Sequence, residues 1–160
     1  MLRSVATAVP AAGALTLTGV APAASAPVPK GEATVLDWPA VKQSDTKPFA
    51  PLLREGADWS VFSHPQRNDR GKPGRKIGDA TARCTAVNVT RAGYVTQCER
   101  VLRTDDGTIT LVDTIDRYGS GPHGADAAIT GGSGAYEDAE GKAELVLYGD
   151  YATFKLTLED

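Results

Sequence analysis

Residues 84–98 read CTAVNVTRAGYVTQC, and this stretch decides the fold. Valine and threonine stand on both sides of a glycine-containing break, which is typical of two β-strands joined by a turn. A hairpin centred on Arg91 places Cys84 directly opposite Cys98. In a non-hydrogen-bonded antiparallel pair the two Cα atoms lie about 4.5 Å apart, close to the lower limit for a disulfide. The spacing therefore predicts a disulfide across one hairpin.

The neighbouring pairs of this hairpin favour the same register. It sets Arg83 against Glu99 and Val87 against Val95, which gives one charge pair and one apolar pair. The alternative use of the cysteines, as a redox-active or nucleophilic thiol, would require a Cys-x-x-Cys motif or a nearby base. The sequence favours the structural disulfide.

Strand-like segments continue on both sides of the hairpin. After residue 78, segments rich in Val, Ile, Thr, Leu and Tyr alternate with breaks that contain Gly or Asp. No convincing 3.6-residue apolar period interrupts them. Regular short strands of this kind predict an all-β sandwich or barrel. The predicted strands are 33–38, 59–62, 80–90, 94–104, 108–118, 124–130, 139–148 and 151–158.

Turn placement predicts which side chains share a face. A two-residue loop at 106–107 sets Arg100 opposite Asp113, on a face whose other members are mostly apolar. A loop at 149–150 likewise aligns the alternate apolar residues of the last two segments. The first of these loops brings two charges onto the predicted core face.

Arg100 and Asp113 are the main candidates for chemistry. A lone charge in an apolar core costs several kcal/mol, so the two must be buried together or line a cavity. In the functional interpretation Asp113 is an acid or base, and Arg100 orients it or stabilises an oxyanion. The alternatives are a structural ion pair or a register wrong by one residue. Asn88, Tyr94 and Thr96 continue the same face and are the candidate ligand-binding residues.

Other chemistry-bearing residues carry weaker signals. His64 and His123 both stand beside proline in loop-like contexts, and their spacing does not resemble a zinc site. Ser120 and Ser133 lie in Gly-rich stretches without the strand-to-helix setting of a nucleophile elbow. Residues 131–134 lack the lysine and the helix that follow a phosphate-binding loop. The sequence predicts no metal site and no cofactor.

The first 26 residues have the layout of a secretory signal peptide. Arg3 precedes an uncharged run of small and apolar residues that ends in Ala-Ser-Ala at 24–26. A retained membrane anchor is the alternative, but proline, glycine and threonine dilute the run. The Pro-rich segment 27–55 is expected to be a spacer, or to supply part of itself as an edge strand. Residues 56–160 are the predicted barrel domain.

The composition and the charge balance limit the classes of partner that the chain can bind. The 160 residues include 17 Gly and 10 Pro, which favours turns over long helices, and 17 Lys+Arg against 20 Asp+Glu give a net charge of -3. A nucleic-acid-binding domain would show clustered basic residues and a basic balance. We therefore expect a secreted, extracellular protein with no nucleic-acid partner and no membrane association after signal cleavage.

A family resemblance enters at residues 128–141. They read AITGGSGAYEDAEG and resemble the signature AITGGTGxYxxAxG of the allene oxide cyclase and dirigent superfamily. The turn DDGTIT at 105–110 resembles the family turn before the corresponding strand, and Cys84 and Cys98 are similar in placement to a cysteine pair of secreted bacterial members. The resemblance covers about residues 78–158. It implies an antiparallel β-barrel of about seven to eight strands with a central cavity.

The resemblance also implies a class of function. Plant members cyclise an unstable fatty-acid epoxide or steer the coupling of phenoxy radicals by holding a reactive intermediate in a shaped cavity. We therefore expect a barrel that binds a small hydrophobic molecule and acts as a cyclase or isomerase. The alternatives are a non-catalytic carrier and an interaction protein with a filled core, which a cavity below about 300 Å³ would favour. Such barrels often form oligomers, so a homo-oligomer is left open.

Overall fold

The computed structural model describes residues 33–49 and 52–159, so the predicted signal peptide lies outside the described residues. The described chain is built from antiparallel strands. They are β1 Thr34–Asp45, β2 Asp58–Asp69, β3 Lys72–Lys76, β4 Gly78–Val89, β5 Gly93–Thr104, β6 Gly107–Tyr118, β7 His123–Gly134, β8 Glu140–Tyr148 and β9 Tyr151–Glu159.

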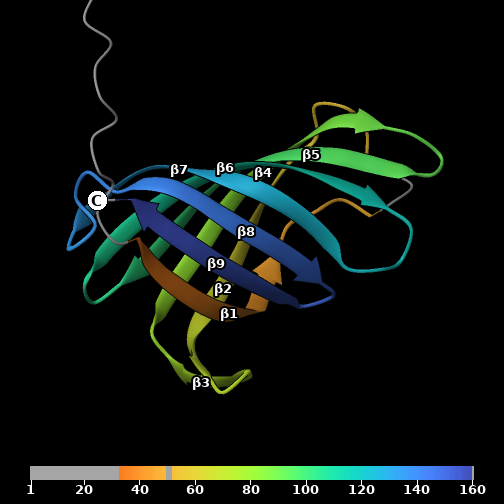
Figure 1. Ribbon diagram of the computed structural model, residues 1–160. Helices are drawn as coiled ribbons and strands as arrows, with labels where there is room; N and C mark the ends of the chain where they lie inside the picture. Colours follow the sequence, from red (N-terminus) through yellow and green to blue (C-terminus); the bar gives the residue numbers. More distant parts are fainter. Residues whose placement is uncertain (1–32, 50–51, 160) are drawn as a thin grey trace, which may run out of the picture.

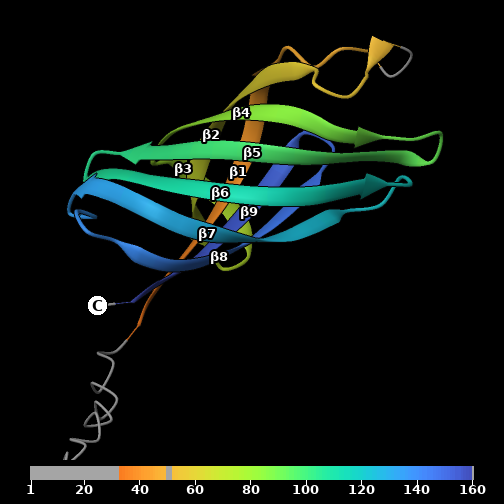
Figure 2. The same ribbon diagram turned by 90° about the horizontal axis from the view of Figure 1, so that it is seen from above.

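Eight of these strands close into a barrel. The sheet order is β1-β9-β8-β7-β6-β5-β4-β2-β3, and β1 also pairs with β2, which joins the two ends of the sheet. Figure 2 shows β4 to β8 lying side by side along one wall. The short strand β3 pairs only with the end of β2 and projects from the barrel (Figure 1). The predicted all-β barrel is confirmed, and the sandwich is excluded.

Alternation along the strands fills the barrel interior. In β6, every second side chain from Ile109 to Ile115 is buried, and the residues between them are more exposed. The buried residues form two clusters. The larger one includes Trp38, Leu102, Ile109, Leu145, Phe154 and Leu156. The smaller one consists of Trp59, Ala82, Cys84, Ala86 and Cys98.

The hairpin of β4 and β5 contains the predicted disulfide. Cys84 and Cys98 are bonded with their Cα atoms 4.1 Å apart. Arg83 opposes Glu99 as expected, but the predicted pairing of Val87 with Val95 is wrong, since Asn88 opposes Val95. A β-bulge after Ala86 inserts one extra residue into β4 and shifts the register toward the turn.

In the hairpin of β5 and β6, each residue of β5 opposes a residue of β6 that lies two positions earlier than predicted. Thr104 pairs with Gly107, so Arg100 opposes Leu111, and the predicted opposition of Arg100 to Asp113 is wrong. A shift of two leaves every side chain on its predicted face. Gly107 lies in β6 and not in the turn. The residue there is glycine because a Cβ would stand 2.0 Å from the Ser133 carbonyl oxygen. Its φ of 147° is a further reason for glycine.

The N-terminal part of the barrel extends further than the short predicted strands. β1 lies inside segment 27–55 and pairs with both β9 and β2, so part of that segment completes the barrel. β2 continues through His64 into a hairpin with β3, although the sequence places His64 in a loop-like context. The last hairpin has the predicted register, with Leu145 opposite Phe154.

The glycine-rich stretch that resembles the family signature brings two backbones close together. A Cβ on Gly132 would stand 2.1 Å from the Tyr136 carbonyl oxygen and 2.6 Å from that of Thr108. The Tyr136 ring meets Trp38 edge to face, with centroids 6.4 Å apart. The stretch therefore has a structural part in the fold.

Candidate functional site

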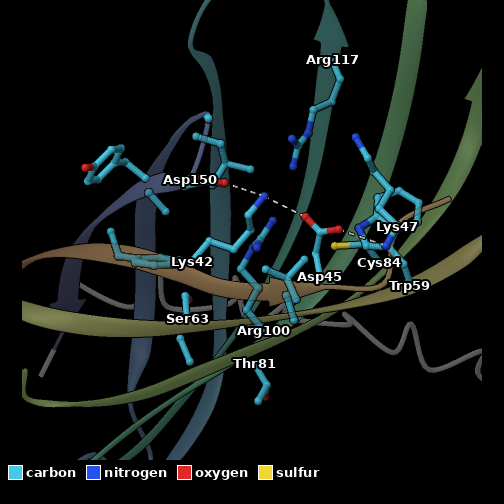
Figure 3. A pocket seen from close by; sticks show the side chains of 18 residues that line it. Lys42, Asp45, Lys47, Trp59, Ser63, Thr81, Cys84, Arg100, Arg117 and Asp150 are labelled. Atoms are coloured by element: carbon cyan, nitrogen blue, oxygen red, sulfur yellow. Dashed lines mark hydrogen bonds and ion pairs between the residues drawn. The ribbon is translucent and has the colours of Figure 1, made fainter. Parts of the chain in front are cut away.

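A cavity of about 130 Å³ opens at one end of the barrel. Members of both buried clusters line it, so it lies where the two clusters separate. Its apolar wall includes Trp59, Ala80, Ala82, Leu147, Ala152 and Phe154. Its charged wall consists of Lys42, Asp45, Lys47, Arg100, Arg117 and Asp150 (Figure 3). The site is thus apolar on one side and charged on the other.

Arg100 and Asp113 form a buried ion pair. Arg100 Nε donates to Asp113 Oδ2 at 2.5 Å, and a terminal guanidinium nitrogen donates to Oδ1 at 3.2 Å. Asp113 opposes Cys98, so the pair is diagonal between the strands. The two residues are 5% and 2% exposed, and Arg100 is the one that lines the cavity. Asp113 therefore positions the guanidinium from behind, and its catalytic role stays a prediction.

Two of the three candidate ligand-binding residues share the inner side of β5, and the third does not. Thr96 is fully buried, and its hydroxyl donates to the Ile115 carbonyl at 3.4 Å. The Tyr94 hydroxyl accepts a hydrogen bond of 3.0 Å from Lys47 Nζ. Asn88 is exposed and donates to Glu55 at 3.4 Å. Thr96 and Tyr94 remain on the inner side, but the bulge turns Asn88 to the outer surface, so the expected shared face is wrong for Asn88.

A lysine bridge that the sequence analysis missed spans the cavity mouth. Lys42 Nζ lies 2.8 Å from both Asp45 Oδ2 and Asp150 Oδ1, so it ties β1 to the turn between β8 and β9. The hydrogen bond to Asp150, followed by that to Asp45, raises the pKa of Lys42. The bond from Lys42 lowers the pKa of Asp45. Lys42 and Asp45 follow the short predicted strand 33–38, and the prolines around them hide from the sequence that the strand continues. Asp150 stands in a predicted turn, and no local pattern shows that this turn meets β1.

Arg117 is the second missed group, and the sequence did contain a signal for it. Ile109, Leu111, Asp113 and Ile115 alternate inward along β6, and the same period of two predicts Arg117 as the next inward residue. Its side chain reaches into the cavity (Figure 3). Its Nε atom is buried and has no hydrogen-bond partner among the described residues. Desolvation lowers the pKa of Arg117, and the nearby charge of Arg100 adds to this.

The other polar candidates lie elsewhere. His64 Nδ1 lies 3.2 Å from Asp79 Oδ1, outside the cavity. Within residues 33–49 and 52–159, no three His, Cys, Asp or Glu side chains gather as a metal site would need. No helix in these ranges is long and apolar enough to cross a bilayer.

Comparison with solved structures decides the type of barrel. The structure named pyocyanin demethylase superposes with a TM-score of 0.60 and 22% identity, over 78% of this chain and 99% of the other. A pterocarpan synthase dirigent protein superposes with a TM-score of 0.58 and 16% identity, over 85% of this chain and 95% of the other. The fold is that of a dirigent-like barrel.

Comparisons at the level of sequence give no match. No protein-family model matches this chain, and no curated protein matches it. At these identities the shared dirigent-like barrel establishes the fold alone, and the function has to be argued from the site.

Proposed function

We propose that this chain is a secreted dirigent-like barrel that binds a small, largely apolar molecule of about single-ring size in its cavity. The observation that carries the proposal is the half-apolar cavity between the two core clusters. An apolar cavity of about 150 Å³ holds benzene in another protein, so about 130 Å³ is room for one ring. A larger ligand would extend through the mouth.

The first candidate activity is that of a cyclase or isomerase. Holding a reactive molecule against a rigid apolar wall restricts its conformations and excludes water. Arg100, fixed by its two bonds to Asp113, supplies a preoriented donor for oxygen-centred negative charge that develops during such a reaction. The two solved structures named above, a demethylase and a synthase, carry names that refer to reactions of small molecules.

The second candidate is a non-catalytic carrier, and the charge pairing favours it. Asp45 and Asp150, the two carboxylates of the cavity lining, both contact Lys42, and Asp113 is held by Arg100. A carboxylate fixed in an ion pair is a poorer acid or base than a free one. The cavity is also smaller than the roughly 300 Å³ of typical ligand sites, and this observation favours the third candidate, an interaction protein, over the other two.

The test is a set of single-ring compounds, among them phenol, indole and benzamide, added to the mature protein. We expect saturable shifts of the Trp59 signals in nuclear magnetic resonance spectra, since Trp59 lines the cavity. Ala152→Leu fills the cavity mouth and should abolish these shifts, whereas Ala128→Leu on the exposed side of β7 should not. Mass spectrometry of the incubated compounds then separates a carrier, which yields no product, from an enzyme.

Binding that Ala152→Leu leaves intact, or no binding by any member of the set, would contradict the proposal.

The extracellular location has its own test. The intact chain should be exported with its first 26 residues removed, and sequencing of the secreted protein should begin at Pro27. The Cys84–Cys98 disulfide is compatible with this location.

A further inference from the structure

One arginine of the cavity lacks the partner that the other charges have. Lys42 contacts two carboxylates, Arg100 is held by Asp113, and Lys47 donates to the Tyr94 hydroxyl. Arg117 forms no ion pair with any residue of the described ranges. Its Nε–H group is buried, and no acceptor among the described residues lies within hydrogen-bond distance of it. A buried donor in this state is unfavourable unless something absent from the free protein accepts from it.

The surroundings of Arg117 determine what that acceptor is. Arg100 reaches into the same cavity from the adjacent strand, and its charge disfavours that of Arg117. Tyr94, Asp113 and Asp45 act in the opposite direction, but Asp113 already accepts both bonds from Arg100, and Asp45 accepts one from Lys42. The four basic side chains of the cavity thus face three carboxylates, those of Asp45, Asp113 and Asp150, which leaves an excess of positive charge. The complement of that excess is an anion.

We propose that the cavity ligand carries a carboxylate, which Arg117 binds with Arg100 beside it while the ring packs against the apolar wall. This inference rests on the proposed small-molecule function and adds the class of ligand to it. A guanidinium presents parallel N–H donors that match the two oxygens of a carboxylate. The wall of Trp59, Ala82 and Phe154 faces the charged side and favours a small cyclic acid over an inorganic anion.

The same geometry explains why a protein would retain an unpaired inner arginine. A desolvated cation without a partner destabilises the fold, and binding sites keep such groups at the expense of stability. Arg117→Met keeps much of the side-chain length and removes the charge. The variant should therefore melt at the same temperature as the wild type or above it. Arg117→Lys keeps the charge but loses the forked geometry.

The probes are benzoate, its neutral analogue benzamide, and inorganic phosphate, each titrated by calorimetry at low salt. We expect the wild type to bind benzoate at least tenfold more tightly than benzamide or phosphate. In Arg117→Met the preference for benzoate over benzamide should fall to near one, with benzamide affinity little changed. Arg117→Lys should retain part of the preference. The control Arg83→Gln removes an exposed arginine of β4 and should retain all of it.

Each other result contradicts one of the two proposals. If benzamide or another neutral ring binds as well as benzoate, the carboxylate inference is wrong and the proposed binding function stands. If phosphate binds as tightly as benzoate, the apolar wall does not contribute and the cyclic-acid class is wrong. An equal loss of preference in Arg83→Gln would show that the effect is general screening. If no compound binds at all, the proposed function itself fails.

Discussion

The Arg100–Asp113 pair is the most consequential contact at the scale of single residues. Replacing Asp113 with Asn leaves the Arg100 charge buried without its counter-ion. Removing one member of such a pair typically costs about 3 to 5 kcal/mol, and we expect about 3 here because Arg100 borders the cavity. Urea unfolding of Asp113→Asn measures this loss.

The double variant Arg100→Met with Asp113→Leu is the matched control for that loss. Because it removes both charges, it should recover most of the stability that Asp113→Asn loses. If the single and double variants are equally unstable, packing rather than charge explains the effect. Either result also bears on whether Asp113 acts by positioning Arg100.

Asp79 is one of the carboxylates whose hydrogen bonds make the fold sensitive to acid. Hydrogen bonds from Lys76 and then Arg103 lower the pKa of Asp79 from its ordinary 3.8 to about 2. A lowered folded-state pKa stabilises the fold above the unfolded value, and this stabilisation disappears as pH falls from about 4 to about 2. Asp79→Asn should therefore melt below the wild type at neutral pH and converge with it near pH 2.

Thermal melts from pH 7 to pH 2 measure this difference. Ala128→Ser, which changes an exposed position of β7 without altering a titratable group, should run parallel to the wild type across the range. A constant gap between Asp79→Asn and the wild type at every pH would mean that the variant acts through packing rather than through titration.

At the scale of strands, Gly107 is a position where a side chain does not fit without a shift of the neighbouring backbone. A Cβ there would overlap the Ser133 carbonyl oxygen at 2.0 Å, and that oxygen belongs to the ladder of β6 with β7. We expect Gly107→Ala to lower the free energy of unfolding by about 3 kcal/mol or more, since the backbone of β7 must shift. Gly119→Ala is the control, because φ is 76° there and nothing lies within 4 Å of the added Cβ.

Gly119→Ala should cost only about 1 kcal/mol, the price of a left-handed backbone for alanine. Chemical denaturation of the two variants gives the comparison. Similar losses in both would show that the close approach at Gly107 relaxes easily and that only the dihedral angle matters.

The same hairpins show what strand patterns in the sequence do and do not determine. Period-two alternation predicted the inner face of β5 and β6, and that face is right, because a register shift of two preserves it. The shift itself was invisible, since glycine at residue 107 signals a turn and a close strand contact equally well. The bulge after Ala86 was also invisible, and it moved Asn88 out of the predicted site.

At the scale of the whole molecule, β1 closes the barrel. It contributes the buried residues Trp38 and Ala40 and pairs with β2 on one side and β9 on the other. A chain that starts at residue 46 should expose two unpaired strand edges and aggregate, whereas a chain that starts at residue 33 should remain monodisperse or form one defined oligomer. Size-exclusion chromatography separates these outcomes. Normal elution of the shorter chain would contradict the closing role of β1.

The pairing of distant strands also explains why some charged residues of the cavity could not be predicted from the sequence. Arg100, Asp113 and Arg117 lie on regular strands, where alternation places a side chain inside or outside. Lys42 and Asp150 meet because β1 pairs with β9, which sets Val41 opposite Tyr151 beside the turn after β8. A contact between such distant positions depends on tertiary structure, and no local pattern in a proline-rich segment reports it.

The pairing of β1 with β9 has a consequence for the order of folding. Thr34 stands opposite Leu158, so the first strand of the barrel finds one of its two neighbours only after nearly all of the described chain has been synthesised. Until then the nascent chain has an incomplete sheet with open edges, and contacts of such long sequence separation form slowly. The barrel therefore closes late in synthesis, and under the export proposed above it would close after the chain has crossed the membrane.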